Sequence, residues 1–253
     1  MGCLMPVAGN IDEVLSVLDR IIAVYRARRS RLAFFPALYR AVTLRVRAGI
    51  QEGVFEDGRR MDRFDTVFAN LYFAALDDIA AGRRPPRAWQ AVFNAEDRRD
   101  TSILQYLLLG MNAHINFDLP IATASLAPAD TLPALRSDFL EINRILAALL
   151  DRVQDIISQF SPLLDLLDRL GGRTDEIIVT FSLINARDEA WHEATRLAAE
   201  PEEQRKRSIL SLDRRVVLLA ERIIVPGGTL GLVLDLIART ENADVVAITE
   251  ARV

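Results

Sequence analysis

The sequence predicts an all-α fold, and three observations support this prediction. Apolar residues recur at intervals of three and four residues nearly throughout the 253-residue chain, which is typical of amphipathic helices. Half of the residues are hydrophobic (51%) and about a quarter are charged (26%), which is the balance of a globular protein. No repeat period and no low-complexity linker divides the chain. We therefore expect a single domain over residues 1–253, built as a bundle of about nine helices.

The helices of the N-terminal half are predicted from caps and breakers. Asn10 followed by Glu13 is typical of a helix N-cap with its capping-box partner. Gly82 and the Arg-Arg-Pro-Pro stretch that follows it indicate a helix end. The predicted helices cover residues 11–29, 34–53, 61–82, a short stretch around Trp89, and a central apolar helix from about Asp100 to Phe117 that ends before Pro120.

The C-terminal half is read in the same way. Ser161-Pro162 is typical of an N-cap with proline in the first turn, and Gly171-Gly172 closes that segment. The predicted helices cover residues 132–160, 161–172, 174–200 and 201–225. Residues 1–9 are expected to be a loose terminus, and residues 241–253 either a loose tail or a short strand.

Composition and charge argue against several classes of partner. The net charge of −4 and the pI near 5.4 give no support to nucleic-acid binding. Cys3 is the only cysteine, which excludes an intrachain disulfide and fits a reducing cytoplasm. The N-terminus lacks the apolar core of a secretory signal, and the uncharged stretch at 223–234 is far short of a membrane span. We expect a soluble cytoplasmic protein with no nucleic-acid or membrane partner; its oligomeric state is left open. Arginine supplies nearly all of the positive charge, with Lys206 the only lysine, which favours a bacterial source.

The central apolar helix carries the polar string that most needs an explanation. In "SILQYLLLGMNAHINFDLP", Asn112, His114, Asn116 and Asp118 directly follow three leucines. A polar group removed from water without a partner costs roughly 2–7 kcal/mol, so the string predicts a buried polar site. Residues four apart share a helix face, which pairs Asn112 with Asn116 and His114 with Asp118.

These pairs have a chemical interpretation and a structural alternative. A carboxylate at Asp118 would orient the His114 imidazole and favour its protonated form, giving an acid/base near neutral pH. The amides of Asn112 and Asn116 would donate to a substrate carbonyl or oxyanion. In the alternative, His114 is a satisfied core histidine, and the other groups close the backbone before Pro120.

Two further clusters add candidate substrate-binding residues. Arg187 is suited to an anionic group through its planar fork, and Trp191, four residues later, to stacking on a ring. Asp65 and Tyr72 lie seven residues apart and hence on one helix face; a buried Asp65 would pair with Arg187 or hydrogen-bond His114. Asp62 is interpreted as an acidic residue of a helix first turn. The spacing of Asp188 and His192 predicts a solvated pair.

Four segments together resemble a known family. "MDRFDTVFANLYFAAL", "LQYLLLGMNAHINFDLPIA", "SDFLEIN" and "ARDEAWHEA" are similar, in this order, to an uncharacterised family of bacterial helical domains with the signature N-A-H-I-N-x-D-L. The likeness runs from about Ile11 to Ala199. It implies a helical fold and no known activity. Pro120 stands where the family often has glycine after the D-L pair.

The sequence therefore leaves three hypotheses for function. The first is an enzyme that uses His114 and Asp118 for acid/base chemistry on a small, largely apolar molecule: cyclisation, isomerisation, elimination or hydrolysis. The second is a non-catalytic helical module that binds a ligand or a partner. The third is a mononuclear metal-dependent hydrolase, but the chain has two histidines and neither H-E-x-x-H nor E-x-x-H. We expect no cofactor and no metal, and a small molecule as the ligand.

Overall fold

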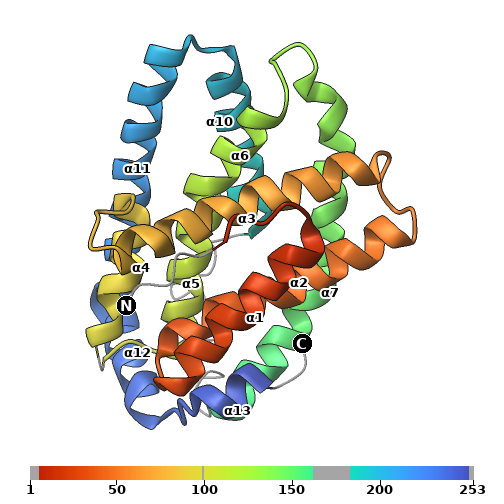
Figure 1. Cartoon of the computed structure of the whole chain (residues 1–253). Coiled ribbons are helices and arrows are strands. Elements are labelled where there is room, and N and C mark those ends of the chain that lie inside the picture. The colour runs from red at the N-terminus through yellow and green to blue at the C-terminus, as the bar shows by residue number, and fades with distance from the viewer. Residues whose placement is uncertain (1–5, 99, 162–182, 251–253) are drawn as a thin grey trace.

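The computed structural model of the chain describes residues 6–98, 100–161 and 183–250. Every regular element in these residues is helical, so the all-α prediction is confirmed (Figure 1). The α-helices are α1 (Ile11–Ala27), α2 (Phe34–Gln51), α3 (Gly58–Ala80), α4 (Arg87–Asn94), α5 (Ile103–Ala113), α6 (Leu119–Leu126), α7 (Arg136–Phe160), α10 (Leu183–Ala199), α11 (Glu202–Ile224), α12 (Gly228–Thr240) and α13 (Val245–Glu250). Four shorter segments are η1 (Arg31–Ala33), η2 (Ala95–Asp97), η3 (His114–Asp118) and η4 (Leu132–Leu135).

The described residues hold eleven α-helices, more than the nine or so that the sequence predicts. The predicted central helix corresponds to α5 and most of η3, while α6, α12 and α13 lie outside the predicted helices. The predictions that fall on residues 162–182, a short helix and the start of the next one, lie outside the described residues.

The central helix does not end before Pro120 as predicted. α5 passes directly into η3, which is π-helical, and η3 into α6, where Pro120 lies in the first turn. In a regular α-helix the proline ring clashes with the carbonyl four residues earlier. Here the backbone N–H of Leu119 donates to the carbonyl of His114, five residues back, and this wider turn lets the chain continue through Pro120. We call α5, η3 and α6 the central rod.

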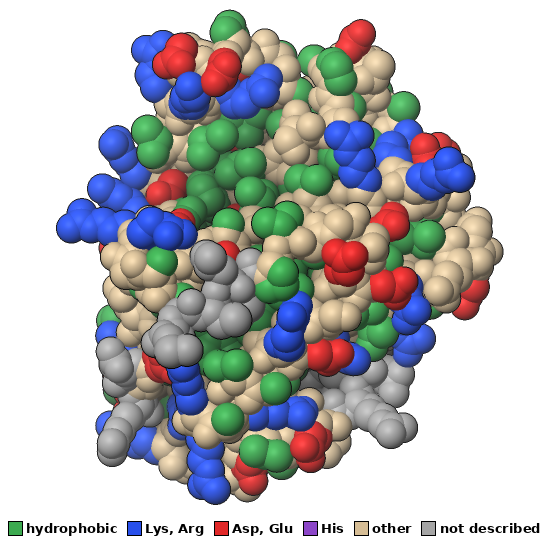
Figure 2. Space-filling view, viewed as in Figure 1, with side chains coloured by type: hydrophobic (Ala, Val, Ile, Leu, Met, Phe, Trp, Pro, Cys, Tyr) green, Lys and Arg blue, Asp and Glu red, His purple; other side chains and the backbone are tan. Residues whose placement is uncertain are grey.

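The other helices surround the central rod. α3 crosses it on one face, with contacts to η3 and α6, and α1 and α2 pack side by side against α3 (Figure 1). α10 packs along α6, while α11 packs against α4 and α5. Hydrophobic side chains gather in a recess between α11 and α6 on the face that α3 crosses (Figure 2). The middle of the rod is thereby enclosed by helices from both halves of the chain.

Both predicted loose termini are attached to the bundle where the structure describes them. Asn10 caps α1 as predicted, since its Oδ1 accepts from the backbone N–H of Glu13 (3.0 Å). Before this cap, Ala8 is buried and exchanges two 2.9 Å hydrogen bonds with the side chain of Asn70 on α3. The loose terminus predicted for residues 1–9 is thus wrong for Ala8, because the Asn70 amide satisfies its backbone.

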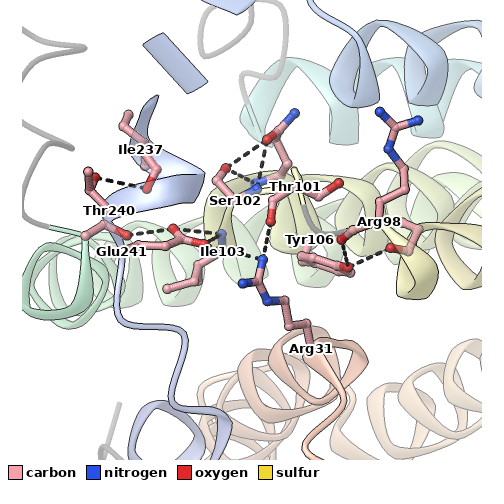
Figure 3. Close-up of polar contacts among 12 residues, drawn as sticks. Arg31, Arg98, Thr101, Ser102, Ile103, Tyr106, Ile237, Thr240 and Glu241 are labelled. Atoms are coloured by element: carbon pink, nitrogen blue, oxygen red, sulfur yellow. Dashed lines mark hydrogen bonds and ion pairs between the residues drawn. The ribbon is translucent and has the colours of Figure 1, made fainter. Parts of the chain in front are cut away.

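The C-terminal segment is a helix and not a strand or a loose tail over Val245–Glu250. Arg26 of α1 donates through Nε to the hydroxyl of Thr249 (2.6 Å). Upstream, Glu241 inserts a carboxylate that accepts from the backbone N–H of Ile103 (2.9 Å), at the start of α5, and lies 3.8 Å from Arg31 (Figure 3). A carboxylate at a helix N-terminus satisfies unpaired N–H groups and the helix dipole, so this contact fixes the start of the central rod.

In the described part of the chain, no single helix is both long and apolar enough to cross a membrane. α11 and α12 reach those criteria only when they are taken together across a bend of 68°.

We predict that Gly110→Ala destabilises the protein. A Cβ at this position of α5 would overlap the Cβ and Cγ atoms of Phe35 on α2, and neither atom can move without shifting the whole ring. Overpacking of this kind costs about 1–3 kcal/mol, which corresponds to roughly 2–12 °C in Tm for a protein of this size. Gly227→Ala is the control, because a Cβ there meets no atom within 4 Å. Equal Tm values for the two variants would contradict the prediction.

Candidate functional site

The predicted polar string coincides with the π-helical segment η3 (His114–Asp118). π-Helical turns inside α-helices are rare and are frequent at functional sites. His114 and Asp118 are both almost fully buried, at 3% and 1% exposure. The segment therefore places two titratable side chains in the interior of the bundle, as the sequence predicts.

The imidazole of His114 is held by a short network of hydrogen bonds. Its Nδ1 lies 3.0 Å from Oδ2 of Asp118, which is the contact that the sequence predicts. The same oxygen accepts from Nε1 of Trp89 on α4 (2.9 Å). Trp89 is fully buried. The Asp118 carboxyl is therefore held by two side chains from different elements, Trp89 of α4 and His114 of η3, and this fixes the orientation of the His114 ring.

Five aromatic side chains surround the imidazole, and we call them the aromatic cage. Phe68 lies face-on over it, with 3.6 Å between ring centroids and 10° between planes. Phe68 is also the one cage ring that is partly exposed, while the other four are buried. The remaining rings, by centroid distance from His114, are Tyr39 (4.5 Å), Phe35 (5.6 Å), Trp89 (6.1 Å) and Tyr72 (6.2 Å).

Three buried polar atoms in or beside the cage have no hydrogen-bond partner. They are Nε2 of His114, Oδ2 of Asp65 and the hydroxyl of Tyr39. Asp65 lies on α3 one turn before Phe68, and it is in electrostatic range of Tyr39. An unsatisfied buried polar atom costs about 1–3 kcal/mol and is uncommon in folded proteins, so three of them together need an explanation.

Burial determines the charge state of these groups. Loss of hydration lowers the pKa of His114 well below its usual value and raises the pKa of Asp118 well above its usual value, although the Trp89 N–H opposes the second shift. Burial, reinforced by the nearby Asp62, raises the pKa of Asp65 to about 7. The expectation that Asp118 favours a protonated imidazole is thus wrong, because desolvation outweighs the carboxylate and favours a pair without net charge.

Asn112 and Asn116 point to a neighbouring helix. Nδ2 of Asn112 donates to the backbone carbonyl of Val216 on α11 (3.0 Å), and its Oδ1 accepts from Nδ2 of Asn116 (2.9 Å). Gln105, two turns earlier on the same helix, donates to the carbonyl of Ile223 (2.7 Å). These amides hold the central rod against α11, and the structure does not bring Asn112 or Asn116 to the unpartnered face of His114.

Arg187 and Trp191 belong to a second cluster. Arg187 is buried, donates to the side chain of Asn143 (2.6 Å) and to the carbonyl of Phe139 (2.7 Å), and lies 4.3 Å above the Phe139 ring. Trp191 packs on the same ring at 5.0 Å. Burial lowers the pKa of Arg187 to about 9. Neither of the contacts predicted for Asp65, with Arg187 or with His114, is formed.

The two clusters are separated by aromatic side chains. Phe64 stands between Phe139 and Phe68, with 6.2 Å between centroids in each direction. Asp188 pairs with Arg136 on α7 and not with His192, which is exposed. Of the predicted site residues, the structure therefore groups His114, Asp118, Tyr72 and Asp65, and separates Arg187 and Trp191 from them.

Sequence reasoning missed most of the cage. A usable signal exists for Phe68, since it lies three residues after Asp65 and four before Tyr72, on the same face of α3. Phe35 and Tyr39 are likewise four apart on α2. No signal connects either pair, or Trp89, to His114, because the sequence does not state which helices meet.

A small cavity lies on the other side of the cage wall. It has a volume of about 10 Å³, which is the space that one water molecule needs. Phe35, Tyr72 and Trp89 line both this cavity and the cage, and Arg31 and Tyr25 also line the cavity. A metal site has less support: within the described residues, no three His, Cys, Asp or Glu side chains are grouped so as to hold an ion.

Comparison with known proteins places the cage inside a recognised family region. The model of a family of unknown function, DUF5995, matches residues 11–226. That region includes every cage residue and extends beyond the Ala199 end of the resemblance seen in the sequence. No curated protein and no solved structure matches the chain.

We predict that Phe68 shields His114 from reagents. In the wild type, diethyl pyrocarbonate should modify the exposed His192 and leave His114 largely unmodified, as measured by peptide mass spectrometry. Phe68→Ala should make His114 reactive, because it removes the one partly exposed ring over the imidazole. Phe93→Ala is the matched control, since Phe93 is also partly buried and stacks on Trp89 but is not one of the cage rings. Equal reactivity of both histidines in the wild type would refute the shielding.

We also predict a pH-dependent effect of Asp65→Asn on stability. Because the folded state holds the Asp65 proton up to a pKa of about 7, folding binds a proton between about pH 4 and 7, and the free energy of unfolding falls as pH rises through that window. Asparagine does not ionise, so the free energy of unfolding of the variant, relative to that of the wild type, should rise by roughly 4 kcal/mol between pH 4 and 8. Urea unfolding at a series of pH values measures this difference. Asp19→Asn, at an exposed ion pair, should show no such trend. If the difference in the free energy of unfolding between Asp65→Asn and the wild type does not change with pH, the raised pKa of the Asp65 carboxyl is contradicted.

Proposed function

We infer the function from the site itself, because the chain belongs to DUF5995, a family whose function is unknown. We propose that this protein is an enzyme that acts on a small, largely apolar molecule, with His114 as its acid/base. Asp118 and Trp89 are positioning residues in this proposal, and the aromatic cage forms the walls of the substrate site.

The observation that carries the proposal is the unpartnered Nε2 of His114. A histidine that only fills space in a core normally has both ring nitrogens satisfied. Here Nδ1 is held by Asp118, which fixes the orientation of the ring, while Nε2 is presented to aromatic side chains. An oriented imidazole with one unused nitrogen is the arrangement that a general acid/base needs.

The geometry supports proton transfer to and from carbon or oxygen. A neutral imidazole, which burial favours, takes a proton at Nε2 with the lone pair directed into the cage. In this tautomer Nδ1–H donates to Oδ2 of Asp118, and this hydrogen bond becomes stronger as the ring becomes positive. Returning the proton to a different atom of the substrate completes an isomerisation, and loss of a leaving group completes an elimination; a cyclisation or a hydrolysis uses the same pair of steps.

Access requires a movement of the cage. Phe68 covers the imidazole at 3.6 Å and is partly exposed, so a change in its side-chain rotamer opens the shortest route from solvent to Nε2. Covers of this kind exclude water during the reaction and admit the substrate beforehand. The enclosed state also supports a second candidate, a non-catalytic module that binds an apolar ligand behind Phe68.

We predict that His114→Gln abolishes turnover and keeps the fold. Wild type, His114→Gln and His192→Gln would each be incubated with a mixture of small apolar metabolites extracted from bacteria, and the mixture compared by mass spectrometry. Wild type and His192→Gln should consume the same compound, and His114→Gln should consume it at least 100-fold more slowly, because general acid/base groups contribute 10²–10⁴-fold.

Three outcomes oppose this proposal. Full activity of folded His114→Gln would place the chemistry elsewhere. Unfolding of His114→Gln together with full activity of Asp118→Asn would show that the pair is structural. Compounds that co-purify with the wild type and are released unchanged would favour the non-catalytic module.

A further inference from the structure

One side of α11 has no partner in the bundle. Its buried side chains, among them Leu212, Val216 and Ile223, lie on the side where the helix packs against α4 and α5. On the opposite side, exposed residues follow one another at intervals of three or four, which places them in one row along the helix. We call this row the outer stripe, and its members are Arg207, Leu210, Arg214, Leu218, Arg222 and Val225.

Cationic and apolar side chains alternate along the outer stripe. Leu210, Leu218 and Val225 are 59%, 60% and 67% exposed, and the arginines stand between them. Exposed apolar side chains that occur singly are ordinary on protein surfaces. Three of them on one face of one helix, over roughly 23 Å of its length, form a row that a partner can cover.

The arginines of the outer stripe have no carboxylate partner. Within the described residues, the ion pairs of α11 are formed by Lys206 and Arg215, and neither of them belongs to the stripe. Arg207 donates through Nε to a backbone carbonyl (3.3 Å), which does not neutralise its charge.

The stripe therefore carries an excess of positive charge, although the whole chain is negative. Glu221 is exposed beside Arg222 and offsets a part of this charge. Figure 2 shows Lys and Arg side chains gathered over α11 and beside the turn between α3 and α4. A complementary partner is acidic.

The alternation decides which acidic partner fits. A second copy of the stripe brings arginines against arginines without a carboxylate between them, which is repulsive. A nucleic acid is contacted mainly through its phosphates and sugars, which leaves the row of apolar side chains uncovered. A bilayer surface fits a helix whose apolar and basic residues lie on different faces, whereas Arg214 stands between Leu210 and Leu218 on the same face.

We propose that the outer stripe of α11 docks an acidic amphipathic helix of another protein, in which carboxylates and apolar side chains alternate at intervals of three or four residues. The apolar rows of the two helices pack together, and each arginine fork meets a carboxylate. The stripe faces away from the side of α11 that receives Gln105 and Asn112, so this inference does not depend on the proposed function.

Two fluorescein-labelled peptides of about 20 residues test the proposal by fluorescence anisotropy with the full-length protein. In the acidic peptide, glutamate and leucine alternate at every fourth position in an alanine–glutamine background. In the neutral peptide, glutamine replaces each glutamate. We expect the acidic peptide to bind at least tenfold more tightly, and its affinity to fall roughly tenfold between about 50 and 300 mM NaCl, because salt screens exposed charges.

Charge reversal gives the sharpest variant. Arg214→Glu combined with Arg222→Glu should lose the acidic peptide and bind a third peptide, with lysine in place of glutamate, about as tightly as the wild type binds the acidic one. Arg45→Glu combined with Arg63→Glu is the matched control, since both arginines are exposed on other helices, and it should behave as the wild type.

A second pair of variants tests the apolar row. Leu218→Ser should weaken binding of the acidic peptide roughly tenfold, whereas Val24→Ser, at another exposed apolar residue, should leave it unchanged. Circular dichroism checks that every variant is folded.

Four results overturn the inference. They are equal affinity for the acidic and neutral peptides, binding of the acidic peptide that survives charge reversal, a dimer in sedimentation velocity that Leu218→Ser dissociates, and flotation with vesicles of phosphatidylglycerol and phosphatidylcholine without binding of either peptide. The third result assigns the stripe to a second copy of the chain and the fourth to a membrane surface. None of them bears on His114, because the stripe lies outside the aromatic cage.

Discussion

The structure depends on one buried interaction, the hydrogen-bonded series from Trp89 through Asp118 to His114. A carboxyl group in the interior of a helical bundle is destabilising unless its oxygens are satisfied. Trp89 comes from α4 and His114 from the central rod, so satisfying Asp118 requires these elements to meet in one register. Removing either partner leaves a buried polar group unpaired, which costs more than the hydrogen bond itself contributes.

The register is set by a second row of polar contacts on the opposite side of the rod. Gln105 and Asn112, seven residues apart, donate to carbonyls of Ile223 and Val216, which are also seven residues apart on α11. Because the two helices run antiparallel and both spacings are two turns, the rod can neither rotate nor slide without breaking both bonds. The amides that the sequence assigns to the substrate instead orient η3, and this orientation is what directs His114 toward the aromatic cage.

Sequence patterns predict contacts within a helix well and contacts between helices poorly. The His114–Asp118 pair follows from a spacing of four residues, and its burial follows from the leucines before it. Phe68 and Tyr39 resemble ordinary core residues, and only the packing of α2 and α3 against η3 brings them to the imidazole. Arg187 illustrates the converse: its chemistry is suited to an anion, but Phe64 and Phe139 separate it from His114. The π-helical turn that carries the chain through Pro120 also has no signal in apolar periodicity.

The unpartnered atoms of the cage support the proposed function over a purely structural role. An apolar side chain in place of His114 would leave no ring nitrogen unsatisfied, yet the chain buries Nε2 of His114, Oδ2 of Asp65 and the hydroxyl of Tyr39 without partners, at about 1–3 kcal/mol each. Burial, together with acidic neighbours, also raises the pKa values of Asp65 and Asp118. Under the proposed function, a substrate that hydrogen-bonds to Nε2 of His114 would remove one of these penalties on binding, and the partly exposed Phe68, which covers the imidazole, would be the ring that moves to admit it.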